Sequence, residues 1–374
     1  MTRLSLTSLA AAVCASLLAA RGVAAQEIPA ESGASTARVG IDSVASADVY
    51  AATADHQGSA VFDISAAWRV SSRVQVSFRP VVSRGLDGTW QSNVYQAAMR
   101  YDRPGRVRLR FEGGYLPSPI GILPLESRAD QNPMITSAQN YDAWLPFFER
   151  GTPWVQLTSG LYPLAAQVTA AAERWDFRGA VLGSSTARTR PLTGEDKPPA
   201  APQLAVGGGV TPFIGLRLGA SFERGVYARA SELAEPSTGD RHATIVGLDA
   251  DYSVGFTRVY ADWIQGVFDR ETGSTTGRAL TVTGVRTLSP RWYVAARLQH
   301  ESTTDALVRP SGSDSLLVHP LTEPQTQLSV ETVAGLRLTP DLTVRAGYYG
   351  SREFGETHLE SHAACSVVWT QRWH

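Results

Sequence analysis

Apolar and polar residues alternate one by one along most of the chain, in segments of about ten residues. In the clearest segment, 291–301, one face carries Trp292, Val294, Ala296 and Leu298, and the other face is polar. Successive side chains of a β-strand point to opposite faces, so each such segment predicts a strand with one apolar and one polar face. The 3.6-residue period of amphipathic helices is nearly absent after residue 26. The pattern therefore predicts an all-β protein.

We expect about 16 strands, with 14–18 possible because segment 152–160 can be paired in more than one way. The predicted strands span 37–43, 59–69, 73–84, 93–102, 106–115, 163–172, 175–184, 203–210, 214–224, 241–252, 256–267, 277–287, 290–301, 326–338, 341–351 and 362–373.

Short and long connections alternate between these strands. The short ones lie at 71–72, 104–105, 173–174, 211–213, 253–255, 289–290 and 339–340. The longer polar ones lie near 85–92, 117–162, 185–202, 225–240, 269–276, 302–325 and 352–361. Short turns at one end and long loops at the other are typical of a transmembrane antiparallel up-and-down β-barrel. A secreted β-sandwich, which buries its apolar faces in a core, is the alternative, but it does not need this asymmetry.

Aromatic residues lie near the ends of the predicted strands, where membrane barrels carry interfacial belts. They are Trp68, Tyr101, Tyr115, Trp175, Phe222, Tyr252, Trp263, Trp292, Tyr348, Trp369 and Trp373. The last segment, 362–374, resembles the C-terminal signal that outer-membrane barrels present to the barrel assembly machinery. That signal ends on an aromatic residue, whereas here His374 follows Trp373.

The first 25 residues have the composition of a cleavable signal peptide, with Arg3 before an apolar stretch and small residues before Gln26. We expect residues 26–36 to form a short periplasmic segment and residues 37–374 to form the barrel, with a long inserted loop at 117–162. These features predict a multi-pass barrel in the outer membrane of a Gram-negative cell, in contact with its lipid.

Charge and chemistry exclude several classes of function. The formal net charge of −1 over 374 residues gives no reason to expect a nucleic-acid partner. Cys365 is the only cysteine after the signal peptide, so no intrachain disulfide can form. The histidines belong to no recognisable nucleophile or metal motif. We therefore expect no catalytic residue, no metal and no cofactor.

If the apolar faces contact lipid, the polar faces line the lumen. The predicted pore-lining residues are Arg73, Arg79, Arg106, Arg108, Arg110, Glu112, Arg217, Arg258, Arg297 and Arg345. Other acids on the polar faces include Asp63, Glu223, Asp249, Asp251, Asp262 and Glu331. Guanidinium groups stay charged and attract anions, so the excess of arginine favours anionic solutes. The alternative is that these arginines pair with lumen acids or lie at the rim of the barrel.

The interruption at 117–162 is long enough to suggest a function and rich in aromatic residues. Here the chain resembles porins, in which a loop after an early strand folds into the barrel and narrows it. The Tyr-Leu-Pro-Ser-Pro-Ile-Gly stretch at 115–121 also resembles a short segment of phosphate-selective porins. The resemblance implies a constriction whose residues are Glu126, Arg128, Asp130, Tyr141, Asp142, Trp144, Glu149 and Arg150. The aromatic residues can equally well pack the loop against the wall.

Two functions follow from these features. The first is a passive pore for small hydrophilic solutes, with a preference for anions, and the porin resemblance also implies a homotrimer. The second is a non-conducting barrel whose outer loops bind a partner or which has a structural role in the envelope.

Overall fold

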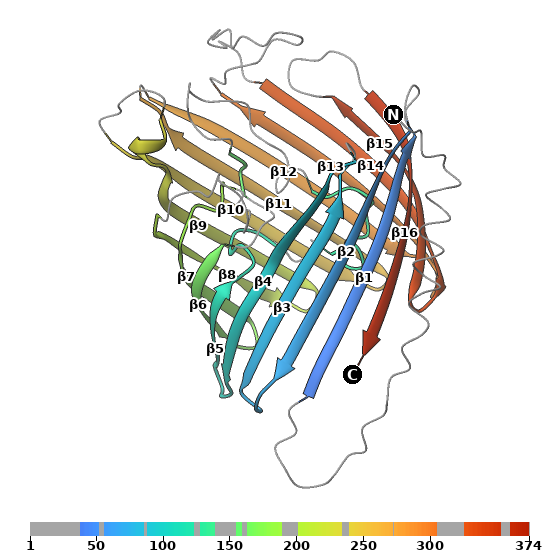
Figure 1. Cartoon of the computed structure of the whole chain (residues 1–374), viewed down its shortest axis with the longest axis horizontal. Helices are drawn as coiled ribbons and strands as arrows, with labels where there is room; N and C mark the ends of the chain where they lie inside the picture. The colour runs from blue at the N-terminus through green and yellow to red at the C-terminus, as the bar shows by residue number, and fades with distance from the viewer. Residues whose placement is uncertain are drawn as a thin grey trace.

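The chain forms one closed antiparallel β-barrel in a computed structural model (Figure 1). The structure describes residues 38–51, 56–85, 88–122, 128–138, 155–158, 163–188, 201–233, 239–271, 273–304, 325–352 and 360–373. The predicted segments 1–25 and 26–36 lie outside these residues. Within the described residues, no helix is long and apolar enough to cross a membrane.

Sixteen strands make up the barrel, and each pairs with its neighbours in sequence. They are β1 (Arg38–Ala51), β2 (His56–Arg69), β3 (Val74–Arg84), β4 (Trp90–Arg103), β5 (Arg108–Tyr115), β6 (Leu164–Ala171), β7 (Trp175–Leu182), β8 (Gln203–Phe213), β9 (Leu216–Ala228), β10 (Arg241–Val254), β11 (Thr257–Asp269), β12 (Ser274–Thr287), β13 (Trp292–Thr303), β14 (Gln325–Thr339), β15 (Leu342–Arg352) and β16 (Glu360–Trp373). A 3-10 turn, Ala230–Glu232, lies between β9 and β10. Pairing of β1 with β16 closes the barrel, so neither strand is left with an open edge.

The outer surface of the barrel is apolar. On β13, Trp292, Val294 and Leu298 are exposed, whereas the alternating Tyr293 and Arg297 are buried inside. This alternation places the apolar face where lipid lies and the polar face toward the lumen, as expected of a membrane barrel.

An aromatic belt surrounds the barrel at the end that carries the short turns, which we call the short-turn end. Its exposed members are Trp68, Tyr101, Trp175, Phe213, Tyr252 and Trp292. Tyr101 packs on Phe111, and Phe213 packs edge-on against Tyr252. Such rings favour the interface between lipid and water, so the belt marks one boundary of the apolar band. The opposite end is called the long-loop end below.

The predicted fold class and strand number are confirmed, and the errors concern strand ends. The first strand was predicted to end at residue 43, but β1 continues to Ala51 because it is paired on both sides, with β2 and with β16. The turn predicted at 211–213 lies at 214–215 instead, where Gly215 has a φ of +94° that side chains disfavour. The fifth strand begins at Arg108 rather than at 106, so Arg106 belongs to the preceding turn.

Candidate pore and its inserted loop

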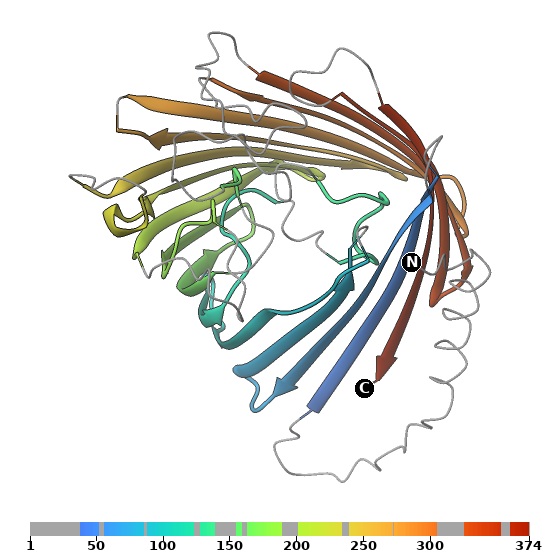
Figure 2. The same cartoon turned by 45° about the horizontal axis from the view of Figure 1, so that its top comes forward.

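Described parts of the loop between β5 and β6 lie inside the barrel (Figure 2). These parts are residues 116–122, 128–138 and 155–158, which we call the inserted loop. Residues 118–121, 134, 135, 138 and 155–158 of this loop are buried. Loops usually lie at the surface, where water can bind their backbone N–H and C=O groups. A buried loop needs other hydrogen-bond partners for these groups, and here the lumen wall provides them.

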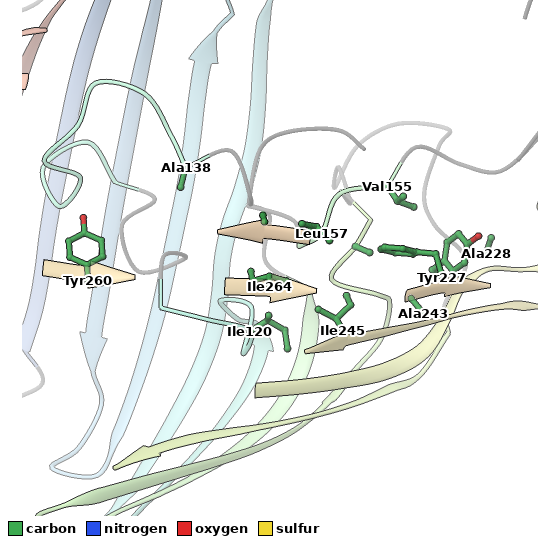
Figure 3. Close-up of a cluster of buried hydrophobic side chains, with 13 residues drawn as sticks. Ile120, Ala138, Val155, Leu157, Tyr227, Ala228, Ala243, Ile245, Tyr260 and Ile264 are labelled. Carbon is green, nitrogen blue, oxygen red and sulfur yellow. The ribbon is translucent and has the colours of Figure 1, made fainter. Parts of the chain in front are cut away.

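One part of the inserted loop packs through apolar contacts on strands β9 to β12. Figure 3 shows Ile120 and Leu157 beside Ile245 and Ile264, in a cluster that buries all four side chains. Ile120 lies over Gly247, where an added Cβ would be in ordinary contact with Cγ2 of Ile120 at 3.5 Å but would clash with Oγ of Ser221 at 2.5 Å. Close packing over this area removes apolar surface from water and holds the loop against the wall.

Acidic wall residues accept hydrogen bonds from the backbone of the inserted loop. Glu331 on β14 accepts from the N–H groups of Ile135 (2.8 Å) and Thr136 (3.1 Å) and from the hydroxyl of Thr136 (2.6 Å). Asp262 on β11 accepts from the N–H of Ile122 at 3.2 Å. These carboxylates satisfy loop donors that would otherwise be buried without a partner.

Arginines of the wall donate to the same loop. Arg345 on β15 donates to the carbonyl oxygens of Asn132 (2.9 Å) and Met134 and also to the hydroxyl of Ser366 (2.7 Å). Arg297 on β13 donates to the carbonyl of Thr136 at 2.9 Å and to Oδ1 of Asn132 at 3.0 Å. Both arginines are only 2% exposed. Two of the predicted pore-lining residues therefore hold the loop instead of facing the solution.

A second connection is held in the same manner. Glu223 on β9 accepts from the N–H of Thr186 at 3.0 Å and from its hydroxyl at 2.5 Å. Thr186 lies in the segment that follows β7. Two segments of the long connections are thus fixed to wall carboxylates.

The opposite wall, on β4 and β5, presents charged groups that are open to water. Asp102 accepts from Nε of Arg100 at 2.6 Å and from Nε of Arg110 at 3.0 Å. The side chain of Arg110 is 43% exposed, and that of Arg100 is 31% exposed. Two guanidinium groups share the carboxylate of Asp102, and Glu112 lies opposite Arg100 across β4 and β5, so the two arginines and two acids of this area balance in charge. Glu112 also accepts from Gln167 at 3.2 Å.

Three more predicted pore-lining arginines are paired with acids on the wall. Arg79 and Asp63 form a buried pair with a shortest distance of 2.6 Å. Arg217 bridges Asp176 and Asp249, and Arg258 pairs with Asp251 at 2.9 Å. Pairs of this kind neutralise the local charge, so these three contribute less to the field in the lumen than an unpaired arginine.

The remaining three lie at the short-turn end. Arg73 and Arg106 are exposed in the turns before β3 and β5, and Arg108 is the exposed first residue of β5. The predicted arginine ladder therefore has Arg106 and Arg108 at the rim, and only Arg110 lies further up the wall.

Of the predicted constriction residues, the structure describes Arg128 and Asp130. They pair with each other at 3.1 Å, with side chains that are 11% and 16% exposed. The other six, Glu126, Tyr141, Asp142, Trp144, Glu149 and Arg150, lie outside the described residues. A cavity of about 250 Å³ separates residues 129–133 from the wall, and Tyr293, Arg337, Thr343 and Arg372 contribute to its lining.

The loop-holding roles of Glu331, Asp262 and Glu223 were not predicted, although all three were placed on polar faces. Gly247 and Gly347 lie beside Ile120 and Ile135 of the loop, but an added Cβ at either would clash with the wall, at Ser221 and Thr332, rather than with the loop, so they are not a signal for it. In the described residues, no group of three or more His, Cys, Asp and Glu side chains is placed to hold a metal ion.

The closed sixteen-strand barrel with a loop inside it has a porin-like fold. The chain is similar to OprB of Pseudomonas putida (TM-score 0.60, 11% identity, 90% of this chain and 94% of that one). It is also similar to OmpT, an outer membrane protein of Vibrio cholerae, in a trimer form (TM-score 0.58, 10% identity, 90% and 99%). An anion-selective porin from Comamonas acidovorans matches with a TM-score of 0.55 at 9% identity, over 90% and 100% of the two chains. No protein-family model and no curated protein sequence matches this chain.

Proposed function

We propose that this protein is a passive diffusion channel of the Gram-negative outer membrane for small hydrophilic solutes, with a preference for anions. The observation that carries the proposal is the division of the lumen into two sides. On one side the inserted loop is fixed to the wall, and on the other the trio of Arg100, Asp102 and Arg110 faces water. A fixed constriction beside a wet, charged wall is the arrangement that sieves solutes and selects among them by charge.

The anion preference rests on the position of the cations. Arg100 and Arg110 are balanced by Asp102 and Glu112, whereas the exposed Arg73, Arg106 and Arg108 lie at the short-turn end near them. Guanidinium groups remain protonated at any physiological pH, so they raise the concentration of anions at this mouth. The likeness to an anion-selective porin supports the same preference.

The partners follow from the same fold. The apolar outer face fits outer-membrane lipid, and β16 fits the role of the strand that the barrel assembly machinery receives. The trimer form of OmpT supports a homotrimer. The mechanism needs no covalent step, and therefore no catalytic residue.

The test is a measurement of single-channel current from the refolded protein in a planar bilayer under a salt gradient. We expect steady open currents and a reversal potential that shows anion preference. A reversal potential of the opposite sign would contradict the role of the arginines while leaving the channel intact.

A folded barrel without current would favour the second candidate, a non-conducting barrel. The observation in its favour is the apolar cluster around Ile120 and Leu157, which fills part of the lumen. Heat-dependent mobility on a denaturing gel would show that the barrel tested is folded.

A further inference from the structure

A groove of about 540 Å³ crosses the outer surface of the barrel on strands β11 to β15. Its lining includes Val294 and Tyr348, which belong to the exposed apolar side chains of the lipid-facing surface. Gly284 also lines it, and a Cβ added there would meet no atom of the described chain within 4 Å. The groove is therefore open to the lipid rather than filled by packing within the wall.

The strand register arranges the lining residues in two adjacent rows that run across the strands. Residues directly opposite each other in an antiparallel ladder have side chains on the same face. The first row is Thr257, Arg286, Val294, Ala334 and Ala346. The second row is Gly284, Ala296, Thr332 and Tyr348. Because several of these positions are glycine or alanine, the surface is hollowed between the larger side chains.

The first row begins at the short-turn end and continues into the apolar band. Thr257 is the first residue of β11, and Arg286 is the last but one of β12. Ala346 lies further up the wall, four residues after Leu342 at the start of β15. The strands of membrane barrels are tilted, so a row across them rises at an angle, and their short turns are periplasmic. The groove thus leads from the periplasmic interface into the hydrocarbon region.

Arg286 supplies a positive charge at the interface end of the groove. Its side chain is exposed, and its Nη1 donates to the hydroxyl of Thr257 at 3.3 Å. The residues opposite Arg286 on the two neighbouring strands are Thr257 and Val294, and neither is charged. A guanidinium group matches the geometry of a phosphate group, and at the membrane interface its long side chain can reach the lipid head groups.

We propose that this groove binds one anionic phospholipid of the periplasmic leaflet. Its phosphate contacts Arg286 and the hydroxyl of Thr257, and one acyl chain lies over Ala334 and Ala346. Charge complementarity favours this occupant. A second copy of the barrel would bring its own apolar outer face, which offers no counter-charge to the guanidinium group. The proposal requires the outer-membrane barrel, but it does not depend on whether the barrel conducts.

The test is native mass spectrometry of the refolded, detergent-solubilised barrel with phosphatidylglycerol, and with zwitterionic phosphatidylcholine as the reference lipid. We expect one phosphatidylglycerol per chain, with a preference of about five-fold, as one arginine near anionic lipid provides. Arg286→Gln should abolish this preference. The matched control is Arg278→Gln, on the outer face of the same strand at its long-loop end, where Arg278 donates to Gln265 at 2.9 Å. This variant should keep the preference.

A second variant tests the path of the acyl chain. Ala334→Leu fills the groove from the lipid side, so it should weaken the binding of both lipids, and heat-dependent mobility on a denaturing gel should show that the barrel is still folded. Equal binding of the two lipids by the original protein, or an unchanged preference in Arg286→Gln, would overturn the proposal. A stable oligomer that retains no lipid would also overturn it, because a second copy would then cover the groove.

Discussion

Two walls of the same barrel use the same kinds of charged residue for different purposes. On the loop-bearing wall, β13 to β15, Arg297, Arg345 and Glu331 are buried and are occupied by hydrogen bonds to the inserted loop. On the open wall, Arg100 and Arg110 are about a third to nearly a half exposed and share Asp102. The difference shows that a lumen position alone does not make an arginine part of the filter.

The physical reason is occupancy and access. A guanidinium group against the loop is held by the carbonyl oxygens that it contacts, and a solute in the lumen cannot reach it. A guanidinium group exposed to the water-filled lumen can be approached by an anion and can pair with it. We therefore expect the loop-bearing wall to control the stability and width of the pore, and the open wall to control its selectivity.

The largest effect is expected from Glu331→Ala. The loss of this carboxylate leaves the N–H groups of Ile135 and Thr136 without their acceptor, at a cost of about 3 kcal/mol. Hydrogen exchange of these two amides in the folded barrel should then become about a hundred-fold faster, since 1.4 kcal/mol corresponds to a factor of ten. The matched change on the open wall, Glu112→Ala, should leave both exchange rates unchanged. Equal effects of the two variants would contradict the division between the walls.

The next effect separates the two walls by function. Arg345→Met should lower the free energy of unfolding by about 3 kcal/mol, because buried carbonyl groups of the loop lose their donor. Arg110→Met should change this free energy by less than about 1 kcal/mol, because the ion pair that it removes is partly exposed.

The reversal potential compares the effects of the same two variants on charge selectivity. Arg110→Met should move it toward cation preference, since Asp102 then has one arginine in place of two. Arg345→Met should mainly increase current noise, as the loop becomes mobile. If Arg345→Met changes selectivity more than Arg110→Met does, the open wall is not the filter.

Much of the fold could be predicted because one physical rule applies to every strand. Each strand has lipid on one side and water or polar protein on the other, so strict alternation appears directly in segments such as 291–301. The rule is harder to apply in β1, because the side chains of Ala45 and Ala47 are small and give little apolar signal. Only the pairing of β1 with β2 and β16 shows that the strand continues to Ala51.

The site was less predictable because its contacts join distant parts of the chain. The sequence places Arg345 on a polar face, but its use depends on Asn132 and Met134, which are more than two hundred residues earlier. Nothing local to either segment specifies that meeting. The sequence pattern also misplaced an arginine near the short-turn end, since Arg106 lies in the turn before β5 and Arg108 is the first residue of that strand.

The smallest effect tests a single hydrogen bond of the loop. In Thr136→Val the isosteric side chain loses the hydroxyl that donates to Oε2 of Glu331 at 2.6 Å, while the two backbone donors to Oε1 remain. We expect a loss of about 1 kcal/mol and about five-fold faster exchange of the Ile135 amide. Thr169→Val is the control on the open wall, where the hydroxyl accepts only a long hydrogen bond of 3.4 Å from Gln167. An unchanged exchange rate in Thr136→Val would mean that the backbone donors alone hold this part of the loop on Glu331.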